Sequence, residues 1–236
     1  GKWTQAPTFP ITKVTQDSRQ ACLGVLYVAL KGERHDGHDF VSTAFRSGAT
    51  AAMVKKGWMP PADVAGLPLL CVEDPAKALT DLAKGYRKTL TAKVIGITGS
   101  AGKTTLKELT AAMLSGAGLT AATPGNYNNE VGLPLSLLSV PEEAKFAVIE
   151  AGISHPNDMD PLADTLVPDA AAISCIGPAH IEYFGTERAI AAEKAKLLAT
   201  VPVTGFAVLP DTCAEFDTLR AACRCRVVTC SLKNES

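Results

Sequence analysis

The stretch "VIGITGSAGKTTLKELTAAML", residues 94–114, constrains the fold more than any other part of the sequence. An apolar run enters a glycine-rich loop, passes a lysine and two threonines, and continues with helical spacing. A strand followed by a glycine-rich loop and then a helix is the structural context of a phosphate-binding P-loop. The match to G-x-x-x-x-G-K-[ST] is imperfect, because Ile97 stands at the first glycine position and Gly96 lies one residue too early. The sequence therefore predicts an α/β domain that binds a nucleotide.

Each residue type in this loop suits a phosphate. Glycines allow backbone N–H groups to approach phosphate oxygens closely, and the N-terminus of the following helix adds its positive dipole end. Lys103 would reach the β- and γ-phosphates, and the Thr104 hydroxyl would ligate Mg²⁺. The plain alternative is a glycine turn beside a solvated lysine. The predicted ATP-binding residues are Gly99, Ser100, Ala101, Gly102, Lys103, Thr104 and Thr105.

The rest of the chain alternates strand and helix patterns. We expect strands at 24–30, 51–56, 68–74, 93–98, 146–152, 170–177, 205–210 and 225–230, with helices between them. Helices of this length between strands imply a largely parallel, doubly wound sheet. The predicted fold class is α/β, with a small N-terminal α/β domain at 1–91 and a P-loop ATPase domain at 92–236.

Composition excludes several classes of protein. The formal net charge of −1 and the lack of a polybasic arm argue against nucleic acid as a partner, so small-molecule substrates are expected. The sequence shows no export signal and no apolar run long enough to span a bilayer. We therefore expect a cytoplasmic monomer without membrane insertion.

Seven cysteines at irregular spacing indicate reduced thiols rather than a disulfide framework. Four of them cluster near the end and raise the question of zinc, but they lack paired CxxC knuckles. We expect them to pack in strands or helices instead. They are Cys213, Cys223, Cys225 and Cys230.

Four stretches together resemble the Mur ligase superfamily. The loop "GITGSAGKTT" has the shifted glycine of that superfamily's ATP-binding loop. "DSRQACLGVLYVALKGERHDGHDF" (17–40), "TPGNYNNEVGLPLSLL" (123–138) and "VIEAGISHPNDMDPLADTLVPDAAAISCIGPAHIEYFG" (148–185) resemble its MurF-type branch, in the expected order. That branch joins D-alanyl-D-alanine to UDP-N-acetylmuramoyl-tripeptide through an acyl phosphate in peptidoglycan synthesis.

The resemblance implies an ATP-dependent amide ligase with catalytic roles for Lys103, His180 and Lys194. Mur ligases have three domains, so it also implies that this chain carries the N-terminal domain and part of the central one. On its own such a chain is expected to be inactive. The implied Mg²⁺ site consists of Thr104, Glu150, His180 and a carbamylated Lys194, with Lys196 as a local rival.

Polar residues at other predicted loops are candidates for substrate binding. By resemblance the N-terminal domain receives the UDP-sugar portion of a UDP-muramoyl-peptide, and its cations suit a diphosphate. The asparagines around Tyr127 suit a polar substrate, although turn formation is an alternative for each of them. The candidates are Ser18, Arg19, Lys31, Arg34, His38, Asn126, Asn128, Asn129 and, more weakly, His155.

Two other functions remain open from the sequence. A MurE-type or other Mur ligase would use a different amine. A non-catalytic module would use the P-loop as a switch.

Overall fold

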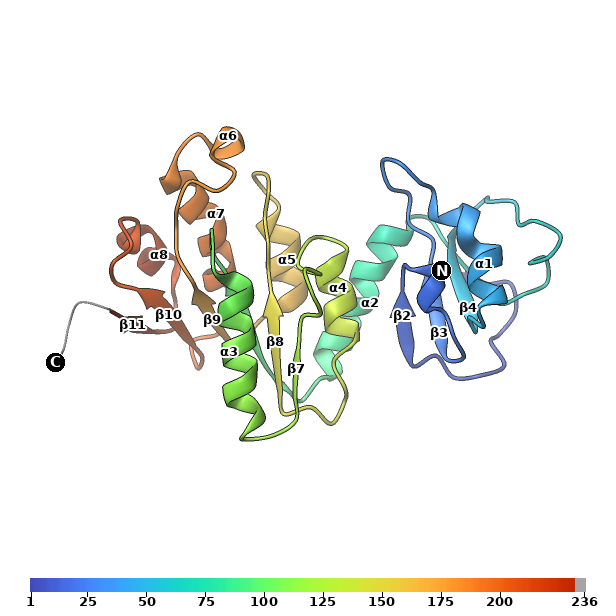
Figure 1. The fold of residues 1–236 in the computed structure, drawn as a ribbon, viewed down its shortest axis with the longest axis horizontal. Helices are drawn as coiled ribbons and strands as arrows, with labels where there is room; N and C mark the ends of the chain where they lie inside the picture. Colours follow the sequence, from blue (N-terminus) through green and yellow to red (C-terminus); the bar gives the residue numbers. More distant parts are fainter. Residues whose placement is uncertain (232–236) are drawn as a thin grey trace. The chain divides into compact units, whose positions relative to one another are not determined.

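The computed structural model describes residues 1–231 and divides the chain into two compact units, Gly1–Leu82 and Ala83–Ser236 (Figure 1). Helix α2 (Pro75–Thr89) begins in the first unit and ends in the second. Its last turn is fixed to the second unit by Arg87. The guanidinium of Arg87 donates to the carbonyls of Leu166 and Val167 at 2.9 and 2.8 Å and pairs with Asp169 at 3.0 Å.

The N-terminal unit is built on a five-stranded sheet of order β1-β5-β4-β3-β2. Only β1 is antiparallel to its neighbour. The core holds Tyr27, Val41 and Val54, with Trp58 partly buried against it. The elements are β1 (Lys2–Trp3), β2 (Lys13–Thr15), the 3-10 helix η1 (Ser18–Gln20), β3 (Val25–Val28), the 3-10 helix η2 (Gly37–Phe40), α1 (Val41–Arg46), β4 (Ala51–Lys55) and β5 (Leu69–Val72).

The second unit contains a six-stranded, wholly parallel sheet of order β11-β10-β9-β6-β8-β7. The strands are β6 (Lys93–Thr98), β7 (Thr120–Ala122), β8 (Phe146–Glu150), β9 (Ala170–Ile173), β10 (Phe206–Pro210) and β11 (Arg226–Cys230). The helices are α3 (Lys103–Ser115), α4 (Gly132–Leu138), α5 (Met159–Leu166), α6 (Ile181–Phe184), α7 (Glu187–Ala199) and α8 (Phe216–Ala222).

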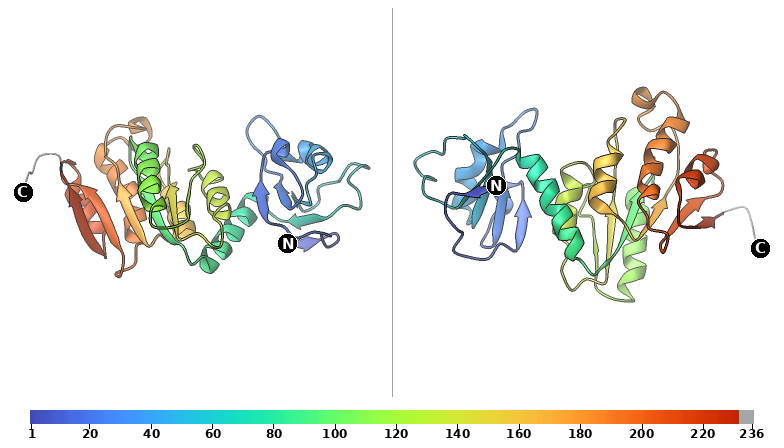
Figure 2. Two further views of the ribbon diagram at one scale, coloured as in Figure 1. Left: turned by 60° about the horizontal axis from the view of Figure 1, so that its bottom comes forward. Right: turned by 180° about the vertical axis from the view of Figure 1, so that it is seen from behind.

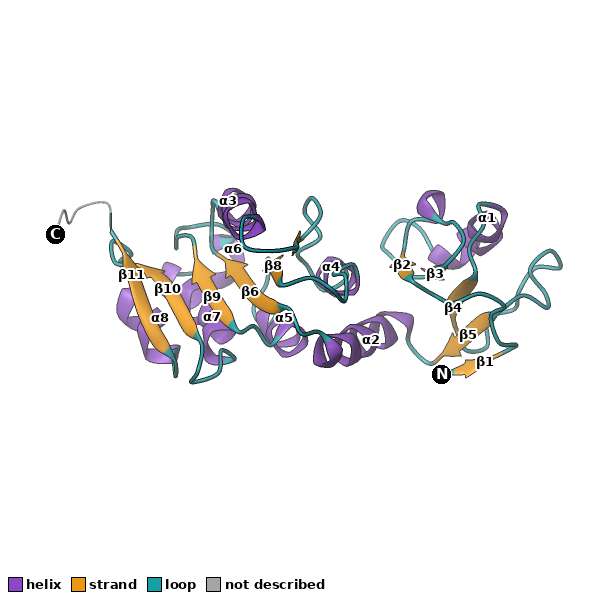
Figure 3. Ribbon diagram, turned by 90° about the horizontal axis from the view of Figure 1, so that it is seen from below, coloured by secondary structure: helices purple, strands orange, loops and turns teal. Residues whose placement is uncertain are grey.

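Helices lie on both faces of this sheet. Figure 3 shows α3 on one face and α5, α7 and α8 on the other, and the view from behind in Figure 2 shows the latter three in front of the strands. The core between the layers is apolar, with Val94, Ile149, Leu166 and Leu197 all buried. The predicted α/β class with a parallel, doubly wound sheet is confirmed.

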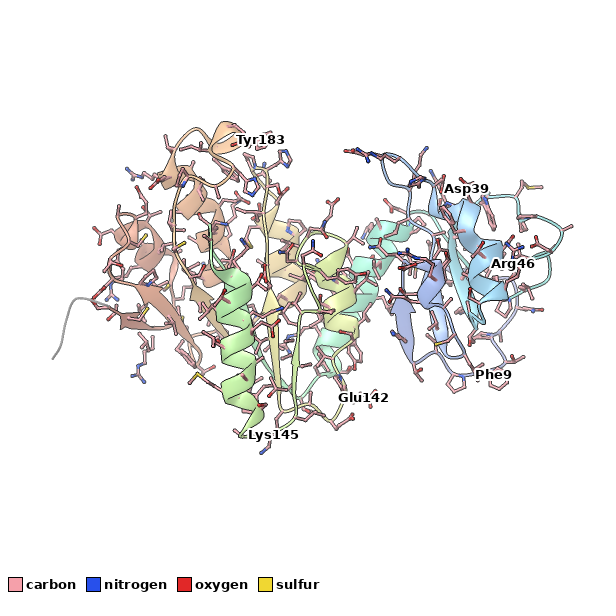
Figure 4. All side chains as sticks on the ribbon, in the orientation of Figure 1. Phe9, Asp39, Arg46, Glu142, Lys145 and Tyr183 are labelled. Carbon is pink, nitrogen blue, oxygen red and sulfur yellow. The ribbon has the colours of Figure 1, made fainter. Side chains whose placement is uncertain are left out.

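All carboxyl ends of these parallel strands meet at one edge of the sheet, which is where α/β proteins bind ligands. In Figure 1 this edge faces upward, and both the start of α3 and α6 lie there. Figure 4 labels Tyr183 at this edge, and Lys145 and Glu142 at the opposite end of the unit.

Candidate functional site

The glycine-rich loop between β6 and α3 depends on two glycines. Gly99 has φ +155°, and a Cβ there would lie 1.9 Å from Ser174 Oγ. Gly102 has φ +73° directly before α3. Side chains disfavour positive φ, so only glycine lets the chain turn this tightly from strand to helix. The first N–H groups of α3 have no partner within the helix and lie at the loop, as anion binding requires.

The loop also contacts the segment after β9, which the sequence did not predict. Ser100 N donates to the carbonyl of Cys175 at 2.9 Å, and Ala101 N contacts Cys175 Sγ at 3.3 Å. Ser174 Oγ donates to the Ala101 carbonyl at 2.5 Å, and Ser100 Oγ contacts Gly177. The amides of Ser100 and Ala101 therefore bond to protein here rather than converging on an open phosphate site as expected. They become available to a phosphate only if these contacts are exchanged.

Two further polar groups mark the loop as a ligand site. Lys103 is half-buried, and its Nζ donates to the Gly99 carbonyl at 3.0 Å, so its charge lies over the loop. Thr98 Oγ1, directly before the loop, is the one buried side-chain nitrogen or oxygen that lacks a partner within residues 1–231. Buried polar groups are nearly always satisfied, so an unpaired hydroxyl here fits a site that binds a polar ligand.

Glu150 joins three separate parts of the site. It ends β8, is 1% exposed, and its Oε2 accepts from Thr104 Oγ1 at 3.0 Å. Its other oxygen accepts from Asn128 Nδ2 at 2.7 Å. Gly152 makes room for this contact, because a Cβ there would lie 2.9 Å from the Asn128 amide. A hydroxyl and a carboxylate at contact distance, beside a phosphate loop, are ligands that Mg²⁺ prefers.

The site offers only part of a metal coordination shell. Within the described residues no three His, Cys, Asp or Glu side chains converge in a way that could hold a metal ion. Thr104 and Glu150 thus fit Mg²⁺ of the kind that keeps phosphate oxygens and water as its other ligands.

Lys194 and Lys196, on α7, have opposite environments. Lys194 is 2% exposed, and burial, followed by the charge of Lys103, lowers its pKa from 10.5 to about 8. Lys196 instead pairs with Asp160 at 2.7 Å and Glu193 at 2.8 Å. Burial lowers the pKa of Lys196, but these two partners outweigh it and leave the pKa raised. Lys194 is therefore the lysine that more readily loses its proton.

The two candidate histidines lie on exposed loops at the same edge. His180 has φ +63° at the start of α6, and no hydrogen bond or ion pair joins its side chain to another of the 231 described residues. The ring of His155 packs against Tyr183 with centroids 4.3 Å apart, which links the loop after β8 to α6. The structure thus brings His155 to Tyr183 rather than to Glu150 or Thr104.

The remaining asparagines differ in their contacts. Asn129 Oδ1 accepts from the amides of Val131 and Gly132 at 3.3 and 2.8 Å, so it caps the start of α4. Asn126 is exposed, and its carbonyl accepts from Asn128 N at 2.8 Å. Asn128, through Glu150, is the member of the three that the structure joins to the phosphate loop.

Candidates in the N-terminal unit lie in the 3-10 helix η1 and on the turn at 31–36 that precedes η2. Ser18 is buried, and Arg19 pairs with Asp17 at 2.8 Å, which holds the pKa of that carboxyl below its usual value. Lys31 and Arg34 are exposed on a turn closed by a bridge between Lys31 and Asp36.

His38 anchors this turn. Its Nδ1 contacts Asp36 at 2.6 Å and its Nε2 accepts from Lys55 N at 3.0 Å. Both ring nitrogens are therefore engaged by protein groups.

A groove of about 1050 Å³ runs along α3 and the face of β6, β9 and β10, and its lining is mainly apolar, for example Leu109 and Phe206. It reaches the phosphate loop, because Ala101, Gly102 and Cys175 also line it. Cys213, Cys223 and Cys225 pack partly buried against the core, whereas Cys230 is exposed. No helix among residues 1–231 combines the length and hydropathy that crossing a membrane requires.

Comparison with known proteins decides the family. The sequence profile described as "Mur ligase middle domain" matches residues 97–236, and "Mur ligase family, catalytic domain" matches residues 10–87. The chain belongs to the Mur ligase family. The middle-domain match begins at Ile97, two residues before Gly99 of the phosphate loop, and includes Thr104, Glu150, His180 and Lys194.

Within this family the chain is similar to MurF. It is 39% identical over 205 residues to UDP-N-acetylmuramoyl-tripeptide--D-alanyl-D-alanine ligase of Escherichia coli K12, covering 87% of this chain and 44% of that relative. The structure matches MurF from Acinetobacter baumannii with a TM-score of 0.88 at 33% identity, covering 97% and 50% of the two chains. It matches MurF from Thermotoga maritima in complex with ADP with a TM-score of 0.80 at 30% identity, covering 94% and 51%. This Mur ligase chain spans about half the length of the relatives it matches.

Proposed function

We propose that this chain is the nucleotide- and UDP-substrate-binding part of an ATP-dependent ligase. The reaction joins D-alanyl-D-alanine to UDP-N-acetylmuramoyl-tripeptide, as the name of its MurF relatives describes. The observation that carries the proposal is the contact of Glu150 with both Thr104 and Asn128. It joins the phosphate loop, the end of β8 and the loop at 124–130 in one polar site.

Amide formation from a carboxylate needs an activated acyl group, because the carboxylate oxygen is a poor leaving group. Transfer of the γ-phosphoryl group of ATP to the tripeptide carboxylate gives an acyl phosphate, and attack by the amine of D-alanyl-D-alanine then releases phosphate. Lys103 and the first amides of α3 hold the phosphates and stabilise charge that develops during transfer. The Thermotoga maritima relative forms a complex with ADP, which supports nucleotide binding by this chain.

Mg²⁺ held by Thr104, Glu150 and phosphate oxygens would neutralise charge during phosphoryl transfer. Asn128 orients one oxygen of Glu150 and leaves the other directed at Thr104. His180 stays a proposed ligand of a second Mg²⁺.

Lys194 is proposed to act as a carbamate. Its neutral Nζ attacks CO₂, an N–C bond forms, and a proton leaves to solvent, so that a cation becomes an anion with two oxygen ligands. The lowered pKa of Lys194 supports carbamate formation, because only the neutral amine reacts.

In the intact protein, Lys194→Ala should remove most activity and a short carboxylic acid should restore part of it. Lys196→Ala should be mild, and the reverse pattern would move the assignment to Lys196.

In the N-terminal unit, Ser18, Arg19, Lys31 and Arg34 are proposed to bind the UDP-sugar portion. With both its nitrogens engaged, His38 would act by holding the turn at 31–36 in shape. Monomeric state and cytoplasmic location stay predictions.

Titration calorimetry tests the substrate. The intact protein should bind UDP-N-acetylmuramoyl-tripeptide at least tenfold more tightly than the dipeptide precursor. Preference for the dipeptide would indicate a MurE-type ligase, and absence of binding to either would indicate a nucleotide-binding module.

Lys103→Ala should remove ATP-dependent ligation with little effect on folding, because a loop lysine adds charge rather than core packing. Near-normal turnover in that variant would refute the P-loop assignment.

A further inference from the structure

Lys107, one helical turn after Lys103 in α3, is a fully buried cation at 0% exposure. Its Nζ donates to the carbonyl of Thr123 at 2.7 Å and lies 2.8 Å from Glu108 Oε1, whose side chain is mostly exposed. Lysine is among the residues least often fully buried, and an apolar side chain of similar volume is often neutral or favourable at such a position. Packing alone therefore does not account for a lysine here.

Thr123, whose carbonyl accepts this hydrogen bond, lies at the junction between β7 and the loop at 124–130. Thr123 is 2% exposed and directly follows β7. Its N–H donates to the Val148 carbonyl at 3.0 Å, and its Oγ1 accepts from the backbone N–H of Glu150 at 2.9 Å. With its carbonyl bound to Lys107, every polar group of Thr123 is bonded either to α3 or to β8.

The loop at 124–130 begins at this junction and returns to the same strand end. Asn128 Nδ2 donates to Glu150 Oε1, and the Asn128 carbonyl accepts from Gly152 N at 2.8 Å. The backbone of Glu150 is thus held by Thr123, and its carboxylate by Asn128 and Thr104. Lys107 connects α3, which carries Thr104, to the start of this arrangement.

We propose that Lys107 is a positioning residue for the site, which fixes Thr123 so that Glu150 and the loop at 124–130 keep their place relative to Thr104. It acts through Thr123 and touches no substrate. The inference rests on the proposed function, in which the site binds a nucleotide together with a divalent cation. Lys107 would couple the binding of this metal–nucleotide complex at α3 to the order of the loop at 124–130.

Two variants test this assignment. Lys107→Met keeps most of the volume and removes the donor, and Lys107→Gln keeps a neutral N–H donor. Lys145→Met is the matched control, because Lys145 Nζ also donates to a backbone carbonyl, that of Ala117 at 3.3 Å, but at the opposite end of the unit (Figure 4).

The first readout is hydrogen exchange measured by mass spectrometry on this chain. Lys107→Met should speed amide exchange at least tenfold in peptides that cover 123–130, with smaller changes in α5 and α8. Lys107→Gln should restore part of the protection, and Lys145→Met should leave these peptides unchanged.

The second readout is ADP affinity by calorimetry, with Mg²⁺ and with a chelator. Lys107→Met should weaken Mg²⁺–ADP binding at least tenfold and change metal-free ADP binding less than threefold. A folded Lys107→Met chain with wild-type exchange at 123–130 and wild-type Mg²⁺–ADP affinity would overturn the assignment. So would unfolding of both Lys107 variants, since Lys107 would then serve folding in general. If the wild-type chain binds no Mg²⁺–ADP, the proposed function fails, and the exchange pattern still decides the positioning role.

Discussion

Replacing Lys194 by methionine should stabilise the second unit, although it removes a residue proposed to be essential. Burial lowers the pKa of Lys194 from 10.5 to about 8, so the folded state binds its proton less tightly than the unfolded state does. At about 1.4 kcal/mol per pH unit, this difference corresponds to a destabilisation of about 3 kcal/mol when the lysine is protonated. Methionine keeps the aliphatic volume without the charge.

The sign of the pH dependence follows from the same difference. Below the folded pKa both states hold the proton, and the full destabilisation is present. Between about 8 and 10.5 the unfolded state holds more protons, so wild-type stability rises with pH. The gain from Lys194→Met should therefore fall from about 3 kcal/mol at pH 7 to about 1 kcal/mol near pH 9.5.

Urea unfolding in CO₂-free buffer measures this gain. With a slope of about 2 kcal/mol per molar urea, the midpoint of the second unit should rise by about 1.5 M at pH 7. Circular dichroism follows the helices of that unit. Both tryptophans, Trp3 and Trp58, lie in the N-terminal unit, so their fluorescence is an internal control that should not shift.

Lys196→Met is the control, and it should change the urea midpoint in the opposite direction. Lys196 is ion-paired and its pKa is raised, so its pairs stabilise the fold at pH 7 and their loss should lower the midpoint. An unchanged or lowered midpoint for Lys194→Met at pH 7, or a gain independent of pH, would show that burial of the Lys194 cation does not destabilise the folded state.

Three further substitutions probe the loop, the metal ligand and the anchor of α2. Gly99→Ala should abolish ADP binding in calorimetry, because its Cβ would lie 1.9 Å from Ser174 Oγ; wild-type affinity would show that the loop adapts. Glu150→Gln should weaken Mg²⁺–ADP at least tenfold while metal-free ADP binding stays unchanged, and equal losses with and without metal would argue against metal ligation. Arg87→Met should destabilise the second unit by about 2 kcal/mol in urea, because the Leu166 and Val167 carbonyls lose their donor and Asp169 its charge partner. An unchanged midpoint would show that water replaces the guanidinium.

The long, strongly patterned elements could be predicted from the sequence. The strand predicted at 93–98 is β6, and the helix expected between the strands at 68–74 and 93–98 is α2 (Pro75–Thr89). Their apolar periodicity depends only on neighbouring residues, so it can be recognised from the sequence without knowledge of the fold. The edge strands β2 and β7 were missed, because each has three residues and no alternation of buried and exposed positions. They form only through pairing with β3 and β8, which sequence pattern does not encode.

The site was predictable where a residue type and its place on a strand end were enough. The resemblance already paired Glu150 with Thr104 as ligands of Mg²⁺, and the structure adds their contact at 3.0 Å. Lys107 and Cys175 were missed. A lysine in an amphipathic helix reads as solvated, and only the packing of α3 on β7 and β8 buries it. The contact of Cys175 with the phosphate loop joins residues 74 apart, which local pattern cannot show.

We propose that this chain supplies the nucleotide and UDP-substrate sites of a ligase for D-alanyl-D-alanine. The most direct measurement is ADP release and product mass in the intact protein with ATP, Mg²⁺, UDP-N-acetylmuramoyl-tripeptide and D-alanyl-D-alanine. We expect one ADP for each amide formed, no product when any one component is omitted, and no product from Lys103→Ala. ADP release that is independent of the tripeptide, or amide formation only with the dipeptide precursor and a different amine, would contradict the account.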